Sequence, residues 1–143
     1  MKILPLILGI VIGLMAITLV TELIEFTTVA ILSGKSFADL SNDPQAYFAV
    51  RNRPGVLIFK IIYNFIAAII GGYLTTWIAK SWAAIGVYLL IAIQTLLLVW
   101  AGFLSDLSTT GPVWMWIALI VITPIGIYAG YRLRGPGKWQ VES

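Results

Sequence analysis

The sequence predicts an all-α integral membrane protein, a bundle of four transmembrane helices. Of the 143 residues, 60% are hydrophobic and only 10% are charged, whereas soluble domains carry about 25% charged residues. Four apolar stretches are separated by polar segments, and each is long enough to cross a hydrocarbon core of ~30 Å, which takes roughly 18 or more apolar helical residues. The length leaves room for one domain, residues 1–143.

The first helix is expected at about 3–32 because the apolar stretch 3–20 runs on without a break until Gly34. A helix of that length measures ~45 Å, which is more than the hydrocarbon core, so it must tilt, bend or project from the membrane. We read it as a spanning helix and not as a cleaved signal, because acidic Glu22 follows soon after and no clear small-residue cleavage site ends the run. The remaining long helices are expected at about 56–79, 82–104 and 113–131.

The connections between these helices differ in length. A tight hairpin should join the second and third helices at Lys80 and Ser81, and a short polar turn, 105–112, should join the third and fourth. The first connection is long, and Asp43-Pro44 within it is a good helix start, since the carboxylate caps free amides and proline suits the first turn. We expect a short interfacial helix at about 44–52, with Tyr47 and Phe48 facing lipid or protein.

Basic residues indicate the orientation. Four crossings place both chain ends on one side, where five basic residues gather, against three or four on the other. The positive-inside rule then predicts cytoplasmic N- and C-termini, in a bacterial inner (plasma) membrane. Tryptophans should mark the two interfaces, with Trp77 and Trp82 at one and Trp100, Trp114 and Trp116 at the other. The basic residues of the terminal side are Lys2, Lys80, Arg132, Arg134 and Lys138, and those of the opposite side are Lys35, Arg51 and Arg53, with Lys60 just inside the second helix.

Composition argues against several functions. The chain contains neither cysteine nor histidine, which removes the commonest metal ligands and the Ser–His and Cys–His catalytic pairs. We therefore expect no enzyme activity, no cofactor and no metal site. The basic residues form no contiguous patch, so no nucleic-acid partner is expected either. The expected partners are the lipid bilayer and other membrane subunits or a second copy of the chain.

Small residues recur four apart in three of the expected helices. In lipid, helices associate through close backbone approach at such small residues. The pattern predicts a compact bundle, or faces that bind a partner protein. Pro124 should bend the fourth helix, because it lacks the donor for the carbonyl four residues earlier. The predicted packing residues are Gly9 and Gly13, Ala67 and Gly71, Ala68 and Gly72, and Gly126 and Gly130.

A few polar residues lie within or near the expected spans. Glu22 and Glu25 are three apart and Lys60 and Asn64 are four apart, so each pair shares one helix face. Since the first two helices run in opposite directions, both pairs should lie near the same, non-terminal end, where a Glu–Lys ion pair is geometrically natural. Gln94, in the middle of the third helix, is expected to form an interhelical hydrogen bond.

Three interpretations of these charges stay open. The charged groups could lie at the outer interface and extend to water. They could form a buried ion pair that fixes the register of the helices. They could also be the site of a proton- or cation-coupled transporter, since charges inside the membrane are costly and often functional.

Taken together, several segments give the chain a resemblance to a family of small four-helix bacterial integral membrane proteins, described as uncharacterised. The resemblance spans nearly the whole chain and implies the four-helix fold, but it brings no assigned activity. The segments are Thr21-Glu22-Leu23-Ile24-Glu25, Asp43-Pro44, Arg53-Pro54-Gly55, Gly71-Gly72, Trp77-Ile78-Ala79-Lys80, Pro112-Val113-Trp114 and Pro124 to Gly130.

Two functional hypotheses follow. The first is a structural or accessory subunit of a larger membrane complex, without its own catalysis. The second is a small oligomeric ion- or proton-coupled transporter that uses Glu22 or Glu25 as its coupling carboxylate and Lys60 as the charge partner.

Overall fold

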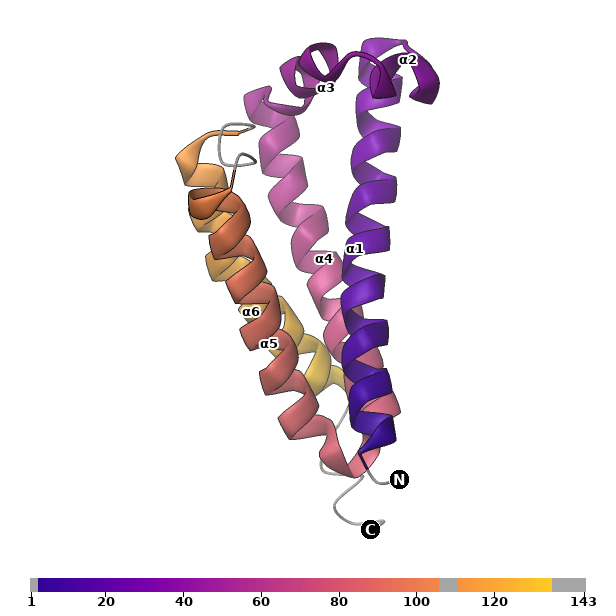
Figure 1. Cartoon of the computed structure of the whole chain (residues 1–143), viewed down its shortest axis with the longest axis vertical. Helices are drawn as coiled ribbons and strands as arrows, with labels where there is room; N and C mark the ends of the chain where they lie inside the picture. The colour runs from indigo at the N-terminus through magenta and orange to yellow at the C-terminus, as the bar shows by residue number, and fades with distance from the viewer. Residues whose placement is uncertain (1–2, 106–110, 135–143) are drawn as a thin grey trace.

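Every secondary-structure element of the computed structural model is helical, over the residues it describes, 3–105 and 111–134 (Figure 1). Three stretches are long and apolar enough to cross a membrane: Leu4–Ser33, Pro54–Leu104 and Val113–Arg134. The all-α class expected from the sequence is thereby confirmed, and so is the presence of helices long and apolar enough to cross a membrane. The expected turn between the third and fourth helices lies partly outside the described residues, at 106–110, as do Lys2 and Lys138. In chain order the helices are α1 (Leu4–Ser33), α2 (Phe37–Ser41), α3 (Pro44–Arg51), α4 (Pro54–Ala79), α5 (Ala83–Val99) and α6 (Val113–Arg134).

The second apolar stretch, 51 residues long, folds back on itself. A 3₁₀ turn at Lys80–Trp82 separates α4 from α5, and Lys80 takes a left-handed φ of 54° there. The two helices therefore run in opposite directions (Figure 1). The third helix was expected as one segment, 82–104, but α5 ends at Val99 and a π-helical turn carries the chain through Trp100–Leu104.

Helix ends in the first connection follow local chemistry. Gly34 ends α1 with a left-handed φ of 71°, and its N–H bonds to the carbonyl of Ala30 at 3.0 Å. Asp43 caps α3 by accepting from the backbone N–H of Ala46 at 3.2 Å. Pro54 begins α4 two residues earlier than expected, because proline suits the first helical position. A second short helix, α2, was not anticipated; the Ser36 side chain caps it at the N–H of Asp39.

The central helix of the bundle is α4, which packs along both α1 and α6, while α5 lies against α6. All the small residues singled out in the sequence lie in these contacts. On one side of α4, the Thr75 hydroxyl donates to the Gly9 carbonyl at 2.8 Å. On the other side, a Cβ on Gly126 would meet that of Ala68 at 2.7 Å. Gly13 similarly faces Gly71 and Thr75, Gly72 faces the backbone of Ile127, Gly130 faces that of Ile69, and Ala67 lies in the same buried core.

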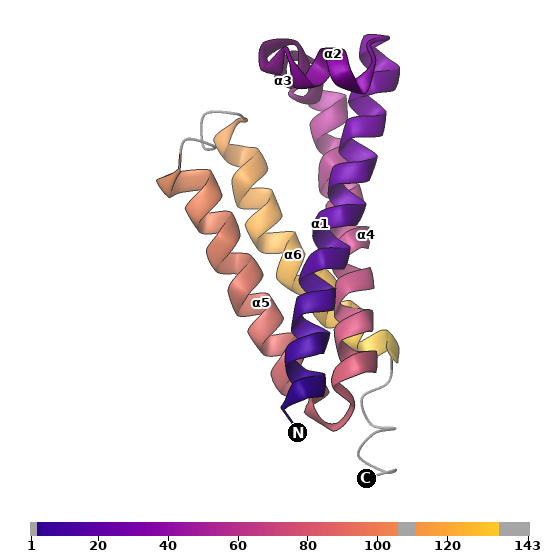
Figure 2. The same ribbon diagram turned by 45° about the vertical axis from the view of Figure 1, so that its right-hand side comes forward.

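The two ends of the molecule differ. At the end where α1 begins and α6 finishes, the terminal end, the helices converge, and a Cβ on Gly86 of α5 would lie 3.3 Å from Leu6 of α1. Toward the other end, the loop end, α5 leans away from α1, and α2 and α3 lie across the tops of α1 and α4 (Figures 1 and 2). The helices are therefore close together at the terminal end and farther apart at the loop end.

Packing changes one sequence expectation about α6. Trp116 was assigned to the interface, but only 7% of it is exposed, because it packs with Leu57, Met115 and Leu119 between α4 and α6. Pro124 lies inside α6, and the helix continues through it to Arg134; the bend expected at this proline stays a prediction.

Candidate functional site

The carboxylate of Glu25 lies at the centre of a buried polar cluster near the loop end. Lys60 of α4 donates to Glu25 Oε1 at 2.5 Å, the Tyr47 hydroxyl of α3 donates to Oε2 at 2.5 Å, and the Tyr63 hydroxyl lies 3.3 Å from Oε1. The side chains of Glu25 and Lys60 are 7% and 12% exposed. Three donors from two neighbouring helices thus satisfy one carboxylate.

Helix geometry explains why these residues meet. Glu25 and Lys60 lie near the loop ends of two antiparallel helices that pack along most of their length. Tyr63 follows Lys60 by three positions, so both side chains emerge from the same face of α4. The ion pair anticipated from the sequence is present, and its burial matches the second of the three interpretations, a pair that fixes helix register.

Tyr47 reaches the cluster because α3 turns its apolar side toward α1. It packs with Val29, Leu40 and Val50 in a small core and contacts the Phe26 ring in a tilted arrangement, with the ring centroids 5.1 Å apart. Burial, together with the hydrogen bond to the Glu25 carboxylate, raises the pKa of the Tyr47 hydroxyl above its usual value. Tyr47 therefore faces protein, one of the two options left open by the sequence, and it fastens α3 to α1.

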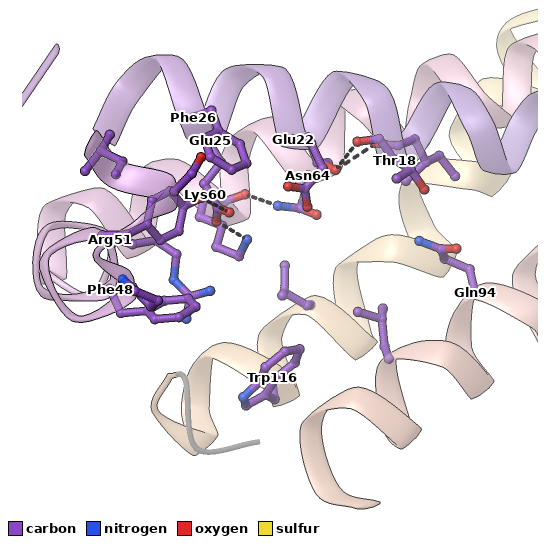
Figure 3. Close-up of a pocket in the computed structure, with 18 residues that line it drawn as sticks. Thr18, Glu22, Glu25, Phe26, Phe48, Arg51, Lys60, Asn64, Gln94 and Trp116 are labelled. Atoms are coloured by element: carbon purple, nitrogen blue, oxygen red, sulfur yellow. Dashed lines mark hydrogen bonds and ion pairs between the residues drawn. The ribbon is translucent and has the colours of Figure 1, made fainter. Parts of the chain in front are cut away.

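Beside this cluster lies a cavity of about 500 Å³, walled by side chains from all six helices (Figure 3). That volume falls within the range of ordinary small-molecule sites. Glu22 on α1, Asn64 on α4 and Gln94 on α5 all line it, so the cavity joins polar residues that are far apart in the sequence. Its other lining residues are Ile17, Thr18, Thr21, Glu25, Phe26, Leu40, Ser41, Pro44, Tyr47, Phe48, Arg51, Lys60, Leu98, Trp116 and Leu119.

The polar side chains of the cavity wall differ in whether they have a hydrogen-bond or ion-pair partner. The side chains of Glu22 and Gln94 make no hydrogen bond or ion pair with any residue that the structure describes. Asn64 donates its amide N–H to the carbonyl of Lys60 at 2.7 Å, which uses a donor and leaves its Oδ1 as an acceptor. The interhelical hydrogen bond expected of Gln94 is thus absent within residues 3–105 and 111–134, because α5 leans away from α1 at this level.

Two lining residues were missed by the sequence analysis. Arg51 is only 5% exposed; its guanidinium lies 4.6 Å from the Phe48 ring centre and bonds to Asn52 Oδ1 at 3.1 Å. Trp116 has a buried indole N–H with no acceptor among the residues that the structure describes. The signal for Arg51 was its position at the end of the short helix, where its long side chain turns back under α3.

No set of three or more acidic, cysteine or histidine residues in the described part of the chain could hold a metal ion. The lining of the cavity includes charged, amide and hydroxyl side chains. They can bind a solute by charge and hydrogen bonding, and a carboxylate can also exchange a proton with water.

Comparison with known proteins adds no assignment. No family model, curated protein or solved structure matches this sequence.

Proposed function

We propose that this protein crosses the membrane four times and carries a small solute through the loop-end cavity, with the Glu22 carboxylate as the coupling group. The observation that supports this most is the cavity itself, which is walled by all six helices at the loop end while small residues bring the helices together at the terminal end. Alternating-access transport uses a polar site that is reached from one side of the membrane at a time, and we assign the loop side to the cavity.

Helix lengths support four crossings. Lys60 precedes the Lys80 turn by 20 residues, which corresponds to ~30 Å of helix and hence to one hydrocarbon thickness. On that scale the Glu25–Lys60 pair lies near the outer rim of the hydrocarbon, and Gln94 lies about halfway through. The lower part of the cavity is then at membrane depth, where polar groups are costly unless they serve a ligand or water.

The proposed orientation uses the basic residues of the sequence. The terminal side has five (Lys2, Lys80, Arg132, Arg134 and Lys138), and the loop side has Lys35, Arg51 and Arg53, with Lys60 just inside α4. By the positive-inside rule, this excess assigns the terminal end to the cytoplasm. The cavity would then face the outside of the cell, or the periplasm if the membrane is a bacterial inner membrane.

The two acidic residues have different roles in this proposal. Glu25 is held by three donors, so a proton or a solute would have to displace an ion pair to reach it. Glu22 lines the same cavity without a described partner. Glu22 is therefore the residue assigned to coupling, and Glu25 with Lys60 holds the helices in place. The four proposed membrane-crossing helices of one chain enclose little more than this cavity. The proposal therefore includes an assembly of two or more copies.

The experiment is uptake into proteoliposomes under an imposed pH gradient, with four labelled probes: phenethylammonium, alanine, phosphate and rubidium ion. Entry into protein-free liposomes is subtracted. At least one probe should accumulate with the wild type and with Asp39→Asn, an exposed carboxylate of α2 outside the cavity, but not with Glu22→Gln. Absence of protein-dependent uptake for all four probes would contradict transport.

The accessory-subunit hypothesis remains a second prediction about this chain. A partner would bind the outer helix faces, which are apolar as any lipid-facing surface is. Purification in mild detergent followed by mass spectrometry tests it: a fixed set of membrane proteins should accompany the chain. A chain that purifies alone, in one or more copies, contradicts it.

A further inference from the structure

We propose that the loop-end cavity binds an organic cation of one kind, a protonated primary amine with an apolar body, whose ammonium group lies against Glu22. The inference rests on the proposed function only in that it uses the same cavity. It concerns binding, which is measurable without transport.

The charges next to Glu22 favour a cation. Lys60 is paired with Glu25 at 2.5 Å. Arg51 keeps its positive charge, because the Phe48 ring and the Asn52 amide that it contacts are neutral. It lies beside Phe48 on the α3 side of the cavity, however, away from Glu22 (Figure 3). Of the two carboxylates, Glu25 is neutralised by Lys60, whereas Glu22 has no ion pair among the described residues. An incoming anion would meet the Glu22 charge, and an incoming cation would be stabilised by it.

The hydrogen-bonding groups near Glu22 favour a cation with N–H donors. The Thr21 hydroxyl donates its proton to the carbonyls of Ile17 and Thr18, at 2.8 and 3.0 Å, so its oxygen can still accept a hydrogen bond. Asn64 donates one amide N–H to the Lys60 carbonyl and keeps its second N–H as a donor and Oδ1 as an acceptor. A carboxylate and two neutral acceptors thus line one cavity, and a primary ammonium carries three N–H donors.

The remainder of the wall favours an apolar body on the ligand. Phe26, Leu98, Trp116 and Leu119 contribute apolar surface to the same cavity, and its volume of about 500 Å³ exceeds what a bare ammonium or metal ion fills. Figure 3 shows Trp116 and Gln94 on the opposite side of the cavity from Glu22 and Asn64. The ammonium would therefore lie toward α1 and α4, and the apolar body toward α5 and α6.

The test is equilibrium binding of phenethylammonium to the purified full-length protein in lipid nanodiscs at pH 7, with empty nanodiscs subtracted. Two ligands of the same shape serve as comparisons, neutral 2-phenylethanol and anionic phenylacetate. Phenethylammonium should bind saturably, and both comparisons at least about tenfold more weakly, because a charge-assisted hydrogen bond is worth that factor or more. Absence of saturable phenethylammonium binding, or equal binding of the alcohol, overturns the proposal.

Variants locate the site. Glu22→Gln should weaken phenethylammonium binding about tenfold or more, Glu22→Asp should retain most of it, and Asp39→Asn should leave it unchanged. Each variant is first shown to elute as the wild type does on size exclusion. Unchanged binding in a folded Glu22→Gln variant overturns the assignment. Binding without uptake in the liposome assay contradicts transport alone, and uptake of another probe without phenethylammonium binding contradicts this inference alone.

Discussion

Glu25 and Lys60, 35 positions apart in the chain, form an ion pair of 2.5 Å whose side chains are 7% and 12% exposed. Because water is nearly excluded, each charge depends on the other for its stability. The pair joins α1 to α4 at the level where the cavity begins. Two tyrosine hydroxyls complete the shell of the carboxylate.

Removing one member of this pair should be costly. Lys60→Met leaves the Glu25 charge buried and uncompensated, and it should lower the free energy of unfolding by ~3–5 kcal/mol. The measurement is reversible unfolding in mixed micelles. The double variant Glu25→Gln/Lys60→Met should recover part of the loss. Lys35→Met is the matched control, since the Lys35–Asp43 pair is 3.9 Å long and about half exposed, and it should change stability by no more than ~1 kcal/mol. Equal effects of the two lysine substitutions would contradict the buried pair.

Tyr47 should make stability depend on alkaline pH. The folded protein raises the pKa of this hydroxyl above its ordinary value of 10.0, so its contribution is complete below about pH 10 and is lost as the pH rises further. Tyr47→Phe removes the hydrogen bond to Glu25 and should cost ~1.5–3 kcal/mol at pH 8. The difference in unfolding free energy between wild type and variant should shrink from pH 9.5 upward. A difference that stays constant to pH 11 would show that Tyr47 does not bond to Glu25 in this way.

Close packing of α4 against α6 predicts opposite effects for two glycines of α4. A Cβ on Gly72 would collide with the backbone of Ile127, whereas one on Gly55 meets nothing within 4 Å. Gly72→Ala should destabilise the protein by ~1–3 kcal/mol or more, and Gly55→Ala should be neutral or stabilising by up to ~1 kcal/mol through helix propensity. Thermal unfolding of the two variants compares them directly. Similar melting temperatures would mean that α4 and α6 are not in backbone contact.

The buried indole N–H of Trp116 has no acceptor within residues 3–105 and 111–134, and an unsatisfied donor costs ~1–3 kcal/mol. Trp116→Phe keeps a ring against Leu57 and Leu119 while it removes that donor, so stability should change by less than ~1 kcal/mol. Trp116→Ala should cost ~3–5 kcal/mol, because it leaves a cavity. If the phenylalanine variant loses as much as the alanine variant, the indole N–H has a partner after all.

Much of the fold could be predicted because its signals are local. Uninterrupted apolar runs define the long helices, and Gly34 and Asp43-Pro44 mark a helix end and a helix start by their own backbone and side-chain chemistry. The level of Glu25 and Lys60 followed from counting residues along antiparallel helices. Those inferences need only the rise of an α-helix per residue and the hydrophobicity of each segment.

The rest depends on how helices rotate about their axes and lean on one another, which sequence periodicity in a membrane protein records poorly. Helices that are apolar all round do not indicate which face is buried. Trp116 was therefore placed at the interface although it packs against α4, and Gln94 was given a partner although α5 leans away. Tyr47 joined the Glu25 cluster only through the orientation of α3.

The most direct test of the central claim, a solute-accessible cavity at membrane depth, is cysteine accessibility. The chain has no native cysteine, so single substitutions are read without background. Gln94 lines the cavity, whereas Leu96, two positions along α5, is 69% exposed on the outer surface of the isolated chain. Since the thiolate formed in water is the reactive species, Gln94→Cys in oriented proteoliposomes should react with a membrane-impermeant thiol reagent added on the loop side, and Leu96→Cys should not. Equal reactivity of the two, or an unreactive Gln94→Cys, would contradict the cavity and the transport proposal built on it.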